Sequence, residues 1–139
     1  MSQVLTKAGK FITVTFSLTA DSSGDVSEST DSGTYGAGDN SKTITDLIKG
    51  TELVGAYAIA GTGGDAPTAL WDVTATDANG VDLFDSALLN LSATAKVGAF
   101  AKIGGIYGSI PVVSALTVVG DNMGSGKKGT VALVFEEVQ

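Results

Sequence analysis

Apolar and polar side chains alternate along several short stretches of this chain. Between residues 11 and 19, four apolar side chains occupy every second position, and hydroxyl side chains fill the positions between them. Residues 71–76 alternate in the same way, and residues 130–138 place three large apolar side chains on one face. Because successive side chains of a strand point to opposite faces, each stretch is predicted to be a strand with one buried face.

Residues 52–60 form another predicted strand whose two faces differ in size. Leu53, Tyr57 and Ile59 are assigned to one face, and the other face holds only Val54 and alanines. A face of small residues indicates that another backbone or sheet approaches closely.

Two hairpins are predicted from the segments that separate the strands. Asp77-Ala-Asn-Gly80 follows the strand at 71–76, and Asn and Gly tolerate the positive φ values of a tight turn. Residues 81–84 are therefore predicted to return beside that strand. Residues 113–119 and 130–138 are predicted to pair as a second hairpin with a long polar loop.

One short helix is predicted at residues 86–91. Ala87, Leu88 and Leu91 fall at positions i, i+1 and i+4, and Asp85 precedes them as an N-cap. Such a helix would close an open end of a sandwich and bury its leucines where the side chains of the sheets do not reach.

The length of 139 residues is that of one domain with its own core. Residues 1–10 are predicted to be an N-terminal arm, polar apart from the apolar pair Val4 and Leu5, that is either frayed or laid on a neighbour. Residues 11–139 are predicted to be a single β-sandwich domain. The fold class is therefore all-β, an antiparallel β-sandwich or jelly-roll with at most one short helix.

Missing residue types narrow the chemistry. The chain has no histidine, cysteine or arginine, which excludes thiolate nucleophiles, Cys-ligated metals and the Ser-His-Asp relay. A net charge of −7 repels nucleic acid. The uncharged stretch 103–119 is interrupted by glycines and Pro111, which favours buried strands over a membrane span. We expect no enzyme, no cofactor, no metal, no nucleic-acid partner and no membrane partner.

Three groups of residues invite a chemical interpretation beside a structural one. Asp72 and Asp82 lie on the facing strands of the first hairpin, so they are either a catalytic carboxylate pair or solvated positions of the strands, and the latter is favoured. Trp71 is either a sugar-binding platform or a core residue, and the alternation with Val73 favours the core. The acidic segment 21–41 either binds calcium or is a solvated loop; EF-hand spacing is not met.

Apolar residues in the glycine-interrupted stretch 97–110 have two interpretations. Phe100 and Tyr107 are either core residues or contacts with another subunit. The candidate subunit contacts are Val4, Leu5, Phe100, Ile103, Ile106, Tyr107 and Ile110.

The stretch Ala66-Pro-Thr-Ala-Leu-Trp-Asp-Val-Thr-Ala-Thr-Asp-Ala-Asn-Gly-Val-Asp-Leu-Phe84 resembles a group of small tailed-bacteriophage virion proteins. These share an Ala-Pro-Thr loop, an aromatic-Asp-Val-Thr strand and an Asp-x-x-Gly turn before Asp-Leu or Asp-Val. Their C-terminal pattern is similar to Leu116-Thr-Val118, the loop from Gly120 to Lys128, and Gly129-Thr-Val-Ala-Leu133. The likeness covers about the last two-thirds of the chain and, more loosely, its first strand. Phe84-Asp85-Ser86 departs from the Gly-Gly that the group often has, and residues 32–49 find no clear counterpart.

The resemblance implies a structural protein of the virion, with a capsid decoration or cement protein on the capsid surface favoured. It implies contacts of loops and the N-terminal arm with the major capsid protein or other virion subunits. It also implies a homo-oligomer, with a trimer favoured. The alternatives are a head–tail connector or tail component, and a carbohydrate-binding receptor module.

Overall fold

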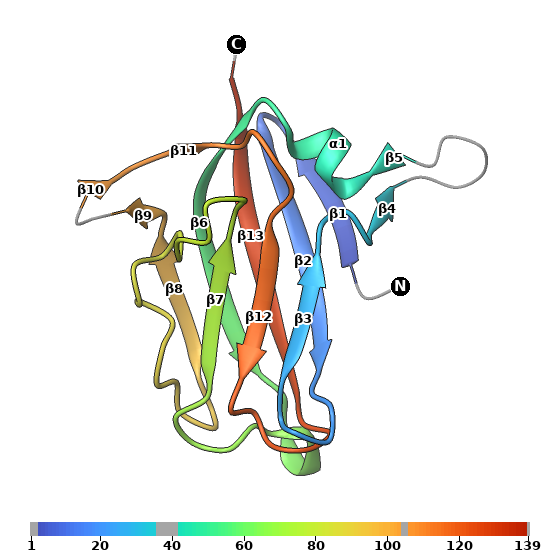
Figure 1. Cartoon of the computed structure of the whole chain (residues 1–139), viewed down its shortest axis with the longest axis vertical. Helices are drawn as coiled ribbons and strands as arrows, with labels where there is room; N and C mark the ends of the chain where they lie inside the picture. Colours follow the sequence, from blue (N-terminus) through green and yellow to red (C-terminus); the bar gives the residue numbers. More distant parts are fainter. Residues whose placement is uncertain (1–2, 36–41, 104–105, 139) are drawn as a thin grey trace.

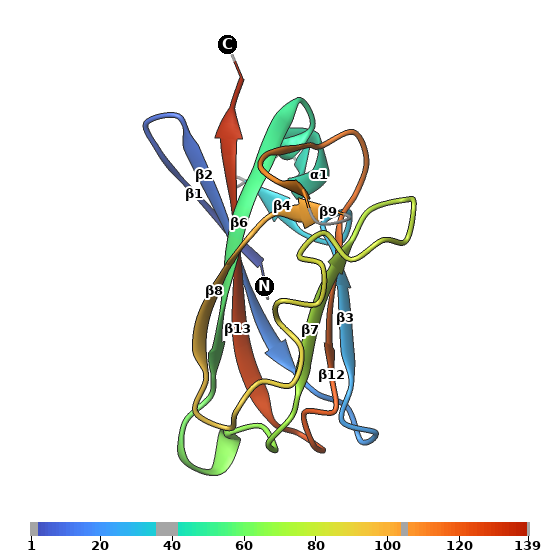
Figure 2. The same cartoon turned by 90° about the vertical axis from the view of Figure 1, so that its left-hand side faces the viewer.

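Two antiparallel β-sheets face each other in the computed structural model, which describes residues 3–35, 42–103 and 106–138 (Figures 1 and 2). The predicted all-β sandwich is confirmed. No helix in these ranges is both long and apolar enough to cross a membrane.

The larger sheet has β13 (Lys128–Glu137) at its centre, between β2 (Phe11–Thr19) and β6 (Thr51–Ala60). β1 (Gln3–Ala8) forms one edge by pairing with β2. β8 (Lys96–Phe100) and the two-residue β11 (Ile110–Pro111) share the opposite edge along β6. We call the surface of β1, β2, β13, β6 and β8 on the side away from the core the large-sheet face.

The smaller sheet has the order β3 (Val26–Ser29), β12 (Thr117–Asp121), β7 (Asp72–Thr76). Two further pairs lie outside the sandwich. They are β4 (Thr34–Tyr35) with β5 (Lys42–Thr43), and β9 (Lys102–Ile103) with β10 (Ile106–Tyr107). A short 3₁₀ turn, η1 (Gly63–Asp65), lies in the connection between β6 and β7.

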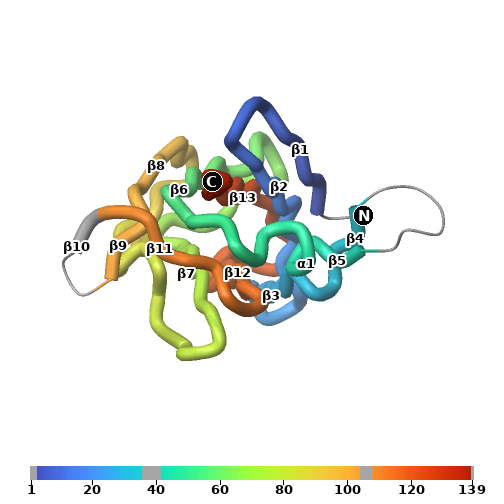
Figure 3. The backbone as a smooth tube through the Cα atoms, turned by 90° about the horizontal axis from the view of Figure 1, so that it is seen from above, coloured from blue at the N-terminus to red at the C-terminus, as the bar shows by residue number. Residues whose placement is uncertain are grey.

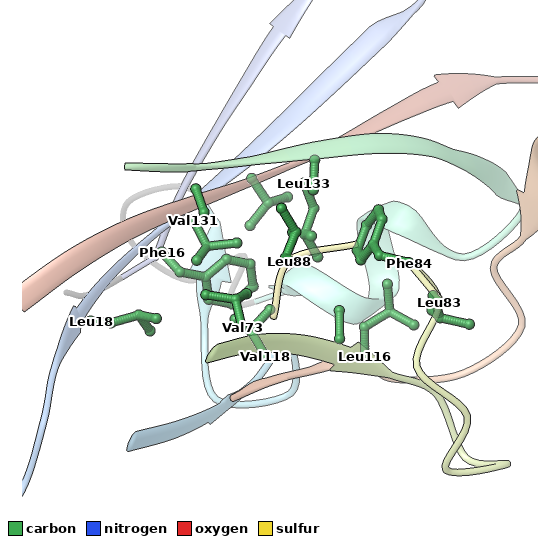
Figure 4. Packing of buried hydrophobic residues seen from close by; sticks show 14 of the residues in the cluster. Phe16, Leu18, Val73, Leu83, Phe84, Leu88, Leu116, Val118, Val131 and Leu133 are labelled. Atoms are coloured by element: carbon green, nitrogen blue, oxygen red, sulfur yellow. The ribbon is translucent and has the colours of Figure 1, made fainter. Parts of the chain in front are cut away.

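One dry interior lies between the sheets (Figure 4). Phe16, Leu133 and Phe135 enter it from the larger sheet, and Val73 from the smaller sheet; all are almost fully buried. Trp71, which directly precedes β7, is buried among them. The buried faces of β2, β7 and β13 are the ones that the alternation predicts.

The predicted N-terminal arm is wrong. Residues 3–8 pair along their whole length with β2, so they form a strand of the larger sheet rather than an arm. Gly9, with φ +60, makes the tight reversal between the two strands. Gln3 is buried at the start of β1, and its side-chain amide donates to the backbone oxygen of Ser29 at 2.8 Å.

The predicted helix at residues 86–91 is also wrong. Asp85 and Ser86 have positive φ values, which break a right-handed helix at its intended start. Leu88 and Leu91 are nevertheless buried, as predicted, but on an irregular segment that Figure 4 shows crossing the interior at Leu88.

The short helix is α1 (Ile44–Ile48) instead, and it covers one end of the sandwich (Figure 3). Thr43 caps it by accepting from the Asp46 N–H at 3.2 Å, and Asp46 accepts from the Thr43 N–H at 3.2 Å. Ile44 and Ile48 are fully buried. The role of closing an open end therefore falls to α1.

The second predicted hairpin does not form, because β12 and β13 belong to different sheets. Of the first predicted hairpin, only the turn and a short stretch of backbone pairing with β7 form. The Gly80 N–H donates to Asp77 O at 3.0 Å, and the Leu83 N–H donates to Ala75 O at 2.8 Å. The main partner of β7 is β12, not residues 81–84.

Candidate interaction surface

The middle of the large-sheet face is almost without charge. Strand registers align its outward residues in three rows that cross the sheet. Two rows run from β1 to β8, Thr6–Thr13–Val134–Gly55–Phe100 and Val4–Thr15–Ala132–Tyr57–Gly98, and the third runs from β2 to β8, Ser17–Thr130–Ile59–Lys96. Lys96 is the one charged residue in these rows, although the chain as a whole carries a net charge of −7.

Charged side chains lie instead beyond these rows, with Lys128 opposite Thr19 at one end of the sheet and two ion pairs at the other. Lys7 and Glu137 form an ion pair at 3.1 Å, and Lys10 and Glu136 form another at 3.5 Å. Both pairs lie near the turn between β1 and β2. Glu136 lies opposite Phe11 on the large-sheet face, so it borders the three rows at that end, whereas Lys7 pairs with the buried Ile12 on the other side of the sheet.

A bulge in β6 decides which of its side chains reach this face. Leu53 pairs with Phe135 and Gly55 with Val134, so Val54 is an extra residue in the ladder. An extra residue reverses the alternation beyond it. Leu53 and the alanines of β6 therefore face the core and Tyr57 faces outward, so the predicted placement of Leu53 and Tyr57 on one face is wrong.

The outer edge of the large-sheet face is hollowed. Gly55 lies opposite Phe100 and Gly98 lies opposite Tyr57, so each aromatic side chain stands beside a position without a side chain. The result is an open hollow of about 540 Å³, which we call the β6–β8 hollow; Val134 is among its lining residues. Most of its lining surface is apolar, and Phe100 is 72% exposed at its margin.

Phe100 also lines a second open hollow, of about 620 Å³, together with Val54, Gly108 and Ser109. The phenylalanine therefore stands between two concave surfaces. An exposed aromatic side chain between apolar concavities is typical of an anchor at a protein–protein interface.

The seven candidate subunit contacts do not form one patch. Val4 is exposed on β1, at the opposite edge of the sheet from Phe100, and Ile103 is exposed in β9. Leu5 and Ile110 are partly buried and pack against the core. Ile106 and Tyr107 belong to β10, but their side chains lie outside the described part of the structure.

Trp71 is a core residue, as predicted. Its side chain is fully buried, and its indole N–H donates to Ser92 O at 2.7 Å. Gly129 lies directly against the ring, because a Cβ there would come within 3.1 Å of it. No face of the indole is open to a sugar.

Asp72 and Asp82 are not brought together. Asp72 is the first residue of β7, whereas Asp82 bridges to Thr76, the last residue of that strand. Asp72 accepts from the Asn90 N–H at 2.8 Å, and Asp82 accepts from the Ser86 N–H at 2.9 Å. Each carboxylate therefore holds the backbone of the irregular segment after β7.

The acidic segment 21–41 is described only as far as residue 35. Asp21 accepts from the N–H groups of Ser23 and Asp25 at 2.8 and 3.1 Å, so it stabilises its own turn. Among the residues that the structure describes, no group of three or more acidic, histidine or cysteine side chains is arranged to hold a metal ion.

Three aspartates approach one another where β12 ends. The pKa of Asp121 is raised, first by the hydrogen bond between its side chain and that of Asp25. Desolvation and the negative charges of Asp25 and Asp72 raise this pKa further. Asn122 lies between them, since its N–H donates to Asp25 at 3.2 Å and its side-chain amide donates to Asp72 at 2.9 Å. These contacts tie β12 to the β2–β3 turn and to β7.

Tyr57, Gly98 and Val134 were missed as surface residues. Gly55 and Gly98, each inside an apolar stretch, are the sequence features that could have indicated this surface. A glycine inside a strand often marks a bulge or a close approach of another backbone. Periodicity alone does not reveal the bulge, because the extra residue is defined by the partner strand.

Comparison with known proteins finds no matching family model, no similar curated protein and no similar solved structure.

Proposed function

We propose that this chain is a structural protein of a tailed-bacteriophage particle, a decoration or cement subunit that binds the capsid surface. The observation that carries the proposal is the large-sheet face, where three rows of outward residues include a single charge. Apart from Lys96 at its edge, another protein can cover such a face without burying an unpaired charge, which would be costly. The motifs of the phage resemblance support the same assignment, since they lie in β7, β12, β13 and the adjoining loops.

The size of the face indicates how the subunit would work. Five strands about 4.8 Å apart and three rows about 7 Å apart give on the order of 500 Å². A stable interface usually buries about 800 Å² on each partner. One contact through this face alone is therefore weak, and the repeated symmetry of a capsid, with many copies bridging neighbouring coat subunits, supplies the stability.

This mechanism differs in one respect from the one that the resemblance implies. Residues 3–8 are paired in β1 and are not a free arm, so we assign the contact to the sheet face and its edge. A connector or tail component would use the same kind of surface, and its position in the particle distinguishes it. A sugar-binding module has less support, because the Trp71 ring is buried and hydrogen-bonded.

The test uses particles of the phage that encodes the chain, grown without its gene. Purified chain is added to these particles, bound chain is measured by co-sedimentation, and the decorated particles are imaged by cryo-electron microscopy. We expect density on the head surface, with the large-sheet face toward the coat. Density on the tail or connector would favour the alternative, and no bound chain would contradict the proposal.

A matched pair of variants locates the contact. Tyr57→Lys places a charge in the β6–β8 hollow and is expected to weaken particle binding by about tenfold or more, because that charge would be buried at the contact. Val113→Lys changes a residue that is 74% exposed and lies outside the three rows, so binding should stay near wild type. Equal binding of both variants would show that the face does not touch the particle.

A further inference from the structure

In the described part of the chain, β8 has one edge paired with β6 and one edge without a partner strand. The hydrogen bonds at the two ends of the β6–β8 ladder show which backbone groups of β8 point toward the unpaired edge. The Ala60 N–H donates to Ala95 O at 2.9 Å, and the Ala101 N–H donates to Val54 O at 3.1 Å. Residues of an antiparallel strand alternate in the direction of their backbone groups. The odd-numbered residues of β8 therefore point their N–H and C=O groups at β6, and the even-numbered residues point theirs away from it.

The outward residues are Lys96, Gly98 and Phe100. Within the part of the chain that the structure describes, no hydrogen bond reaches their backbone groups. Figure 2 shows the segment after β7 running between β8 and β7, and so leaving the plane of the larger sheet open beyond β8. Exposed edge strands of this kind accept a further strand by backbone pairing.

We propose that the occupant of this edge is β8 of a second copy of the chain, paired antiparallel about a two-fold axis at Gly98. In this register Gly98 faces Gly98 of the second copy, and Lys96 faces its Phe100. All three outward residues of both strands then lie in hydrogen-bonded pairs. An axis shifted by one residue would leave one outward residue of each strand without a partner in β8.

Side-chain chemistry favours the same register. Lys96, Gly98 and Phe100 share the large-sheet face, so each ammonium group would lie beside the aromatic ring of the other copy, in a cation–π contact. Two copies with a net charge of −7 repel each other, and β8 contains no carboxylate that would add to this repulsion. A lysine on an edge strand often prevents pairing, but here it would meet a ring rather than another lysine.

The pairing is self-complementary and closed, so it gives a dimer with one continuous sheet across both copies. A dimer differs from the trimer that the phage resemblance implies. The inference rests on the β8 edge alone and holds whether or not the chain is a virion protein.

Sedimentation equilibrium over a concentration series tests the dimer, and two variants of one residue test its register. In Phe100→Lys, the new lysine of each copy faces Lys96 of the other copy, so the dimer contains two pairs of like charges. This should raise the dimer Kd by about tenfold or more. Phe100→Glu places a carboxylate opposite Lys96 and should leave the Kd within about threefold of wild type. Lys96→Glu combined with Phe100→Lys should restore the dimer.

Three results would overturn the proposal. They are a wild-type chain that is monomeric at about 1 mM, equal weakening by Phe100→Lys and Phe100→Glu, and a trimer or larger assembly. Because Phe100 is 72% exposed, the monomer of every variant should keep the Tm of the wild-type monomer, which circular dichroism checks at a concentration well below the dimer Kd. The Lys96 and Phe100 double variant serves as a second check, because a register other than the one at Gly98 would not be rescued by it.

Discussion

Thr30→Val removes a buried hydroxyl at the end of the sandwich that α1 closes. Thr30 is fully buried, and its Oγ1 lies 2.6 Å from Oγ1 of Thr45. The same oxygen accepts from the Leu116 N–H at 3.0 Å. Valine has nearly the same shape but neither donates nor accepts, so the substitution leaves the Leu116 N–H and the Thr45 hydroxyl without partners in the interior.

The expected loss follows from those two groups. A buried polar group left unpaired costs about 1–3 kcal/mol. The added methyl group of valine returns up to about 1 kcal/mol through burial. We therefore expect Thr30→Val to lower the free energy of unfolding by about 1–5 kcal/mol, a large part of the stability of a typical domain.

Urea denaturation followed by Trp71 fluorescence measures this loss as a shift of the midpoint at unchanged slope. Thr30→Val with Thr45→Val should lose less than the sum of the single changes, because the orphaned hydroxyl is then absent. Thr15→Val, on the large-sheet face, is the control and should stay within about 0.5 kcal/mol of wild type. A loss for Thr30→Val as small as that of the control, or a strictly additive double variant, would refute the reasoning.

Two further predictions concern the β6–β8 hollow and the aspartates at the end of β12. Gly55→Ala should lower Tm, because its Cβ would lie 2.9 Å from a backbone oxygen of β8, whereas Gly98→Ala should leave Tm nearly unchanged, because its nearest contact is 3.6 Å. Equal melting temperatures for the two would contradict this packing. The raised pKa of Asp121 means that its contribution to stability is fully present below the unfolded pKa near 3.8 and is lost as pH rises through the folded pKa. Asp121→Asn should therefore be more stable than wild type at pH 7, by less than about 1 kcal/mol because the side chain is exposed, and this advantage should shrink toward pH 4. An advantage that grows on acidification would contradict the assignment.

Local periodicity predicts individual strands of this fold well. The buried faces of β2, β7 and β13 follow from alternation, because burial of one face imposes a two-residue period. The same period does not say which sheet a strand joins. Residues 113–119 and 130–138 both alternate, yet β12 and β13 lie in opposite sheets, because that choice depends on partners distant in the sequence.

The site was harder to predict, because its geometry comes from irregularities. Tyr57 turns outward through a bulge that only the pairing with β13 defines. The positive φ values of Asp85 and Ser86 prevent the predicted helix from forming. The two leucines of that segment are nevertheless buried, as predicted. Phe100 was named as a candidate contact from its apolar, glycine-rich surroundings, but the glycines that hollow the face beside it were not.

Amide hydrogen exchange along β8, measured by NMR at several protein concentrations, most directly tests the claim that the chain acts through the edge and face of its larger sheet. Val97 and Ala99 should exchange slowly at every concentration, because their N–H groups point at β6. Lys96, Gly98 and Phe100 should exchange fast in dilute solution and slow down as copies pair. Fast exchange at these three amides at every concentration would contradict the account.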